Sequence, residues 1–151
     1  MSHLEMHQFI CRSDNYGLLV HDHKTGATAS IDAPDALAIE KQLAKRGWQL
    51  THIFTTHHHG DHVEGNQQLK DQFGCIIVGP MAEADRIPAI RKQVSGGETF
   101  TWAGREVKVG RGNGVETEIL EGVGEGARLV VYPGDKVTDG ARVNPLVVGR
   151  R

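Results

Sequence analysis

Four side chains able to hold a metal ion are crowded into one short segment, residues 56–62. His57 and His59 are two positions apart, so they point the same way if the segment is extended. Asp61 and His62 follow directly. Imidazole and carboxylate together suit a borderline divalent cation such as zinc, with iron and manganese as alternatives. The spacing indicates two half-sites, one begun by His57 with His59 and the other by Asp61 with His62.

Two neighbouring cations would give this segment a definite chemistry. Together they can hold and deprotonate a shared water at neutral pH, and the resulting hydroxide can attack a carbonyl. His58, between the predicted ligands, is expected to point away from them and to have a structural role. The alternative is a surface histidine-rich loop or a fragment of an affinity tag, but a tag lies near a terminus and lacks the interleaved Gly60 and Asp61.

The flanking residues predict how this segment is positioned. Residues 50–55 form an apolar, β-branched run that is typical of a short buried strand. Residues 62–70 are compatible with a helix. The cluster is therefore expected where a strand ends and a helix begins, and in open α/β sheets sites collect at the carboxyl ends of strands.

The rest of the chain predicts a mixed sheet with helices. The order strand, helix, strand around the cluster favours parallel pairing with a right-handed crossover. A helix is expected from Pro34 to its C-cap at Gly47, and Trp48 is expected to pack in the core. His21 and His23 are expected to be solvated, and His3 and His7 to lie in a disordered terminus. The further predicted elements are strands at 9–11 and 74–78, hairpins at 16–31 and 98–109, and either a helix or a helix plus loop over 81–94, which Pro88 interrupts.

Composition narrows the class of protein. The chain has 151 residues and a net charge of −2, with 5% aromatic residues, which argues against a nucleic-acid partner. No apolar run reaches transmembrane length, and residues 1–8 lack a signal-peptide pattern, so neither a membrane partner nor export is expected and the cytoplasm is the predicted location. Cys11 and Cys75 are expected to be buried free thiols.

The segment Thr56-His57-His58-His59-Gly60-Asp61-His62 resembles the T-H-x-H-x-D-H motif of the metallo-β-lactamase superfamily, and within it the glyoxalase II (hydroxyacylglutathione hydrolase) group. Asp14-Asn15-Tyr16, Ile31-Asp32-Ala33-Pro34 and Val78-Gly79-Pro80 resemble further segments of that group, so the likeness covers about residues 5–105. The resemblance implies an α/β fold, the N-terminal half of an αββα sandwich, over residues 1–106. It also implies zinc, or iron or manganese, in up to two sites, with Asp61 as a catalytic residue as well as a ligand.

The resemblance to glyoxalase II stops after Val109. The family continues with a G-H-T-x-G-H segment, a bridging aspartate and a later histidine, whereas all nine histidines here lie at or before position 62. Asp135, at the end of an apolar run, either replaces the bridging carboxylate or is a turn residue, and the turn is favoured. Residues 107–145 resemble the C-terminal β-domain of periplasmic adaptor proteins. A β-rich tail of different origin is therefore predicted for residues 107–151, and the chain is expected to be a fusion, a truncation or a chimera.

Three functions follow from these observations. The first is a metal-dependent thioester hydrolase with a small-molecule substrate and an incomplete metal site, since a catalytic zinc usually has three protein ligands. The second is a non-catalytic remnant with weak or no metal binding, and the third, ranked last, is an adaptor module. Half of a sandwich leaves one sheet face without its partner layer, so a homo-oligomer covering that face is expected.

Overall fold

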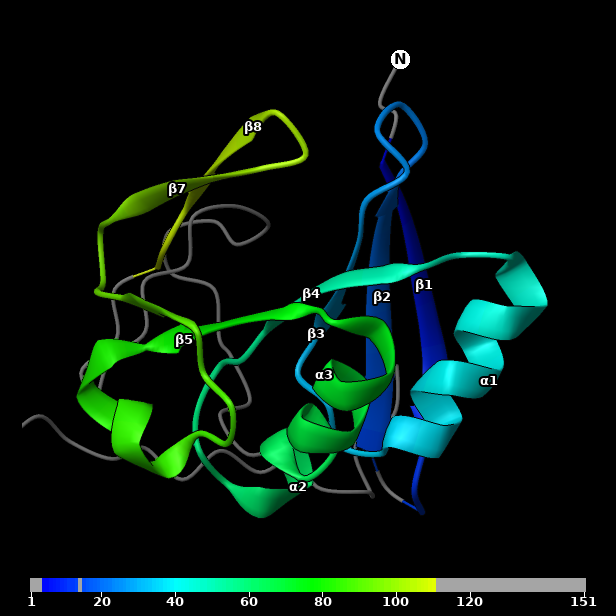
Figure 1. Cartoon of the computed structure of the whole chain (residues 1–151), viewed down its shortest axis with the longest axis horizontal. Helices are drawn as coiled ribbons and strands as arrows, with labels where there is room; N and C mark the ends of the chain where they lie inside the picture. Colours follow the sequence, from blue (N-terminus) through cyan, green and yellow to red (C-terminus); the bar gives the residue numbers. More distant parts are fainter. Residues whose placement is uncertain (1–3, 14, 111–151) are drawn as a thin grey trace, which may run out of the picture. The chain divides into compact units, whose positions relative to one another are not determined.

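The structure, a computed structural model, describes residues 4–13 and 15–110. A six-stranded sheet has the order β1-β2-β3-β4-β5-β6, and β7 and β8 form a separate hairpin (Figure 1). The predicted α/β class with a mixed sheet is confirmed. The strands are β1 (Leu4–Cys11), β2 (Asn15–Asp22), β3 (Thr28–Ile31), β4 (Leu50–Phe54), β5 (Ile76–Pro80), β6 (Lys92–Val94), β7 (Thr99–Trp102) and β8 (Arg105–Lys108). The helices are α1 (Ala36–Arg46), α2 (Gly60–Val63), α3 (Asn66–Phe73) and the 3-10 helix η1 (Met81–Arg86).

The sheet changes direction at β3. Strands β1, β2 and β3 pair antiparallel, whereas β3, β4, β5 and β6 pair parallel. Helix α1 connects β3 to β4, and α2 with α3 connects β4 to β5. The predicted parallel pairing around the histidine cluster is therefore confirmed, and the carboxyl ends of β3, β4 and β5 meet at one edge of the sheet.

Local signals at both ends set the limits of α1. The carboxylate of Asp35 caps the helix by accepting the Ala38 N–H at 3.1 Å. Gly47 ends it with a φ of 67°, a conformation that glycine adopts without strain. The helix thus ends at the predicted residue but begins after Pro34, which was expected in its first turn. Ile39 and Leu43, on its inner face, are fully buried.

The main core lies between the sheet and the helices α1 and α3. Leu19 of β2, Ile53 of β4 and Ile77 of β5 point into this layer, where they join Leu43 of α1 and Leu69 of α3. Each of these side chains is at most 1% exposed. Full burial of aliphatic side chains contributes about 1.5–3 kcal/mol each, so this layer holds the strand ends in place.

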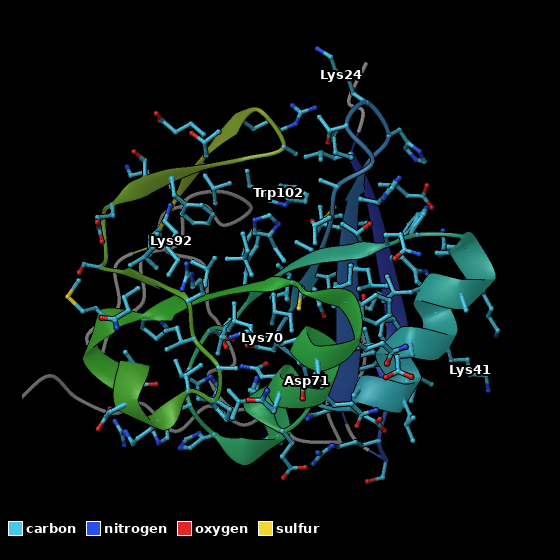
Figure 2. The ribbon with its side chains drawn as sticks, viewed as in Figure 1. Lys24, Lys41, Lys70, Asp71, Lys92 and Trp102 are labelled. Atoms are coloured by element: carbon cyan, nitrogen blue, oxygen red, sulfur yellow. The ribbon has the colours of Figure 1, made fainter. Side chains whose placement is uncertain are left out.

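The opposite face of the sheet is covered in part by the β7–β8 hairpin. Phe54 of β4 meets the rings of Phe100 and Trp102 at centroid distances of 5.4 and 5.6 Å, and Figure 2 shows Trp102 below the hairpin. The pairing register places Ile10 and Tyr16 on this same face. Both are exposed, as is Met6, which pairs with Val20. Part of this face is thus apolar and open to solvent.

Three expectations about local structure were wrong. The helix expected over residues 62–70 is instead two helices, α2 and α3, divided at residues 64 and 65. Residues 81–94, expected to be a helix or a helix plus loop, form the short 3-10 helix η1 and, farther on, the strand β6. His21 is buried because the Trp48 ring stacks on it at 4.4 Å between centroids, and its Nδ1 lies within hydrogen-bond distance of the Thr28 hydroxyl.

Two smaller points complete the fold. His7 lies within β1 and contacts Gln42 of α1, so it is not part of a disordered end. Trp48, Cys11 and Cys75 are buried as predicted, and both cysteines are free. None of the helices in residues 4–13 and 15–110 combines the length and the apolarity that crossing a bilayer requires.

Candidate metal centre

The histidine loop, residues 55–59, connects the carboxyl end of β4 to α2 (Figure 1). Its first residue continues the strand, because Thr55 donates its N–H to the Val78 carbonyl oxygen of β5 at 2.8 Å. Its last residue, His59, is extended, with φ −61° and ψ 144°, and stands at the N-cap of α2. The loop therefore lies where the sequence predicts it, between strand and helix.

Asp32, directly after β3, accepts hydrogen bonds from Thr56 in this loop and from His62 in α2. One carboxylate oxygen accepts the Thr56 N–H at 2.7 Å, and the other accepts the Thr56 hydroxyl and His62 Nδ1, each at 2.8 Å. The side chain is buried, and its backbone has a φ of 59°, which aspartate tolerates better than most residues. Asp32 reaches the loop because β3 and β4 are parallel neighbours, so their carboxyl ends lie side by side.

These contacts fix which ring nitrogens carry protons. An ionised carboxylate only accepts hydrogen bonds, so the Nδ1 of His62 must be its protonated nitrogen. The Thr56 hydroxyl donates to Asp32 and so accepts at its own oxygen from the Nδ1 of His57, at 2.9 Å. In both histidines the Nε2 lone pair is left available. Neutral imidazoles held in this way are the form that binds a metal ion.

Four of the five predicted ligands lie close to one another in pairs. The ring of His57 lies 4.1 Å from that of His62 and 4.7 Å from that of His59, between centroids. The carboxylate of Asp61 is 3.5 Å from His62 Nε2. Within the described residues no group of three or more His, Cys, Asp or Glu side chains converges to hold an ion. The fifth predicted ligand, Asp135, lies outside the described residues.

The surroundings favour the metal-binding protonation states. Burial, with a contribution from the neighbouring His62, lowers the pKa of His57 below its usual value. Burial acts to raise the pKa of Asp61, but His62 and the Asn15 side chain outweigh it, so the net shift is downward. At neutral pH the imidazole of His57 is therefore neutral and Asp61 is ionised, as coordination requires.

His58 faces a different partner from its neighbours. Its backbone N–H and its Nδ1 contact the same oxygen of Glu83, at 2.8 and 3.0 Å. Its Nε2 lies 3.1 Å from Nη1 of Arg86. The contacts agree with the prediction that His58 is not a ligand. Glu83 was not predicted, because nothing in the sequence of η1 indicates that it lies beside the histidine loop.

Main-chain hydrogen bonds join α2 and α3 to the Asp32 segment. Ala33 donates its N–H to the His62 carbonyl oxygen and accepts the Gly65 N–H, each at 2.8 Å. Glycine is required at position 65, since an added Cβ would lie 3.0 Å from the backbone nitrogen of Ala36. The close approach sets the distance between Asp32 and His62. A Gly three residues after the motif is the sequence signal that could have revealed it.

Comparisons with known proteins agree with this arrangement. The family model described as the Metallo-beta-lactamase superfamily matches residues 25–141. The chain is 60% identical over 106 residues to hydroxyacylglutathione hydrolase from Brucella ovis, and equally to that from Brucella abortus. Each alignment covers 70% of this chain and 41% of the relative, so the chain spans less than half the length of these relatives.

Solved structures show the same fold at lower sequence identity. ETHE1 from Myxococcus xanthus superposes with a TM-score of 0.59 and 24% identity, over 69% of this chain and 46% of that one. A metallo-beta-lactamase from Staphylococcus aureus gives a TM-score of 0.57 and 20% identity, over 70% and 32%. The family match runs past residue 107, where the sequence predicts a tail of different origin. That tail lies almost wholly outside the described residues, and its origin stays a prediction.

Proposed function

Because the chain belongs to the metallo-beta-lactamase superfamily, we propose that it is a metal-dependent thioester hydrolase of the hydroxyacylglutathione hydrolase type. The observation that carries the proposal is that the contacts of Asp32 and Thr56 leave Nε2 unprotonated in both His57 and His62, whose rings lie 4.1 Å apart between centroids. The 60% identity to hydroxyacylglutathione hydrolases supports the choice of substrate class.

The donors fit a divalent cation in type and in protonation state. Imidazole nitrogens and a carboxylate suit zinc, and also iron or manganese. We propose that His57 and His59 hold one ion and that Asp61 and His62 hold a second. A bound cation polarises a thioester carbonyl and lowers the pKa of water near it.

The chain's own residues have separate tasks in this proposal. Asp32 and Thr56 keep the proton of His57 on Nδ1, away from the ligand side of the ring. Asp61 stays ionised beside His62, so its carboxylate can accept a hydrogen bond from water and orient it toward the substrate. Both tasks depend on β3 and β4 ending at the same edge of the sheet.

A second function is favoured by one observation, that the described residues gather no group of three metal donors. A chain with only pairs of ligands binds a cation loosely, because catalytic zinc usually has three protein ligands. The alternative is therefore a non-catalytic protein of the same fold with weak or no metal binding.

Metal analysis and turnover distinguish the two. We expect about two equivalents of zinc, iron or manganese per purified chain and hydrolysis of S-D-lactoylglutathione. His59→Ala should abolish hydrolysis, whereas His23→Ala, an exposed histidine on the β2–β3 hairpin, should leave it unchanged. Less than one loosely held equivalent without turnover would support the non-catalytic alternative.

Location and association are proposed on separate grounds. Free, buried Cys11 and Cys75 suit a reducing compartment, which supports the cytoplasm.

The exposed side chains of Met6, Ile10 and Tyr16 support association of copies of the chain through the sheet face that the β7–β8 hairpin covers only in part. Size-exclusion chromatography with light scattering tests the association, and a monomer at all concentrations would refute it. No nucleic-acid or membrane partner is proposed.

A further inference from the structure

Glu83 makes two contacts with the histidine loop through a single oxygen atom. That oxygen accepts the His58 backbone N–H at 2.8 Å and lies 3.0 Å from the Nδ1 of the same residue. The side chains of His58 and Glu83 are 25% and 27% exposed, so water competes only in part for these bonds. The hydrogen bond from His58 also lowers the pKa of Glu83, which keeps the carboxylate ionised.

Arg86 completes the arrangement from the last turn of η1. A guanidinium only donates hydrogen bonds, so the Nε2 of His58 accepts from Nη1 of Arg86 at 3.1 Å. Glu83 only accepts, so the Nδ1 of His58 carries the proton. Both ring nitrogens are therefore engaged, which excludes His58 from metal binding although it stands between two predicted ligands.

The histidine loop is consequently held at two alternate residues. Asp32 fixes Thr56 through its N–H and its hydroxyl, and Glu83 fixes His58 through its N–H and its ring. His57 lies between the two fixed residues, and His59 follows the second. By fixing the main chain of His58, Glu83 restrains the backbone between His57 and His59, and the His58 ring also lies 4.8 Å from the His59 ring, between centroids.

We propose that Glu83 is a positioning residue, which restrains the backbone segment that carries the two predicted metal ligands His57 and His59. The inference rests on the proposed metal centre and adds a part of the chain, η1, that the sequence motif does not contain. Arg86 supports Glu83 by fixing the tautomer of His58. Removal of a partner that orients ligands in this way typically weakens metal affinity about 10- to 100-fold.

The test compares Co²⁺ binding by the full chain and three variants, followed by the d–d absorption spectrum of the bound ion. Glu83→Ala should bind Co²⁺ about 10-fold or more weakly than the unaltered chain. Glu83→Gln keeps one acceptor oxygen and should recover part of the affinity. Asp85→Ala, which removes an exposed carboxylate from the same 3-10 helix, is the matched control and should bind like the unaltered chain.

Nitrogen-15 NMR of the metal-free chain gives a second readout that a role in fold stability alone would not produce. His58 should show the Nδ1–H tautomer in the unaltered chain and in Asp85→Ala, and a mixture of tautomers in Glu83→Ala. Equal Co²⁺ affinity in Glu83→Ala and the unaltered chain would overturn the inference, even if the variant melts at a lower temperature. The Nε2–H tautomer in the unaltered chain would overturn it as well.

Failure of the proposed function gives a different result. A chain that binds Co²⁺ with the expected loss in Glu83→Ala, but hydrolyses no thioester, would refute the hydrolase and leave the positioning role supported. A chain that binds no Co²⁺ at all would overturn both.

Discussion

Replacing Asp32 by asparagine tests the central feature of the site, a buried carboxylate that accepts hydrogen bonds from both halves of the metal motif. Asparagine has the same shape and tolerates the φ of 59° at this position, so the backbone is not disturbed. Its oxygen can still accept the Thr56 N–H. Its NH₂ group, however, would face two donors, the Thr56 hydroxyl and His62 Nδ1.

The cost follows from these contacts. Hydrogen bonds to charged groups contribute about 1.5–3 kcal/mol each. Of the three bonds that Asp32 accepts, those from the Thr56 hydroxyl and His62 Nδ1 are lost, although the hydroxyl can turn to a new partner. We therefore expect a loss of about 3 kcal/mol in the free energy of unfolding. His62 must also move its proton to Nε2 to accept from the new NH₂ group, which blocks the nitrogen that would bind metal. Metal affinity should fall about 10- to 100-fold.

Urea denaturation and Co²⁺ titration measure the two effects. Asp35→Asn is the matched control, because Asp35 is three residues away and asparagine caps a helix as well as aspartate does. The control should change neither stability nor metal affinity appreciably. If Asp32→Asn kept the metal affinity of the unaltered chain and the Nδ1–H tautomer of His62, the assignment of Asp32 as the residue that orients both histidines would be refuted.

Further predictions concern packing, pH and thiol reactivity. Gly65→Ala should lower the free energy of unfolding by about 1–3 kcal/mol, because its Cβ would press on the Ala33 carbonyl oxygen at 2.9 Å; an unchanged urea midpoint would contradict this. Burial lowers the pKa of His21, so the unfolded chain binds more protons than the folded chain. The free energy of unfolding should therefore fall as the pH drops below about 6.5. The fall should be smaller in His21→Asn than in the unaltered chain. Burial raises the pKa of Cys75 to about 11 and also raises that of Cys11, so neither thiol should react with iodoacetamide at pH 8 until urea unfolds the chain, which mass spectrometry detects.

The order of the elements was predictable because strong local signals mark them. The apolar run before the motif became β4, and Gly47 ended α1 where expected. Strand β6 was missed, since Lys92-Gln93-Val94 is short and mostly polar and owes its conformation to pairing with β5. The local sequence pattern thus predicted β4 and the end of α1, but it did not predict β6, whose conformation depends on pairing with β5.

The position of the four predicted ligands in the fold was predictable, whereas the contacts that hold them were not. The type and spacing of His57, His59, Asp61 and His62 were enough to place them at one strand end. Asp32 and Thr56 are 24 residues apart in the chain. The parallel pairing of β3 with β4 brings them into contact, and the supporting role of Asp32 depends on it. Contacts of that kind arise from tertiary structure, and residue types alone do not indicate them.

The hydrogen bonds that join Ala33 to His62 and Gly65 use only main-chain atoms. Peptide groups are the same whatever the side chain, so substitutions on the outer surfaces of α2 and α3 leave this connection intact. Such substitutions should therefore leave the distance between the Asp32 carboxylate and the His62 imidazole unchanged. The positions of Asp32 and His62 relative to each other therefore do not depend on the side chains that α2 and α3 present to solvent.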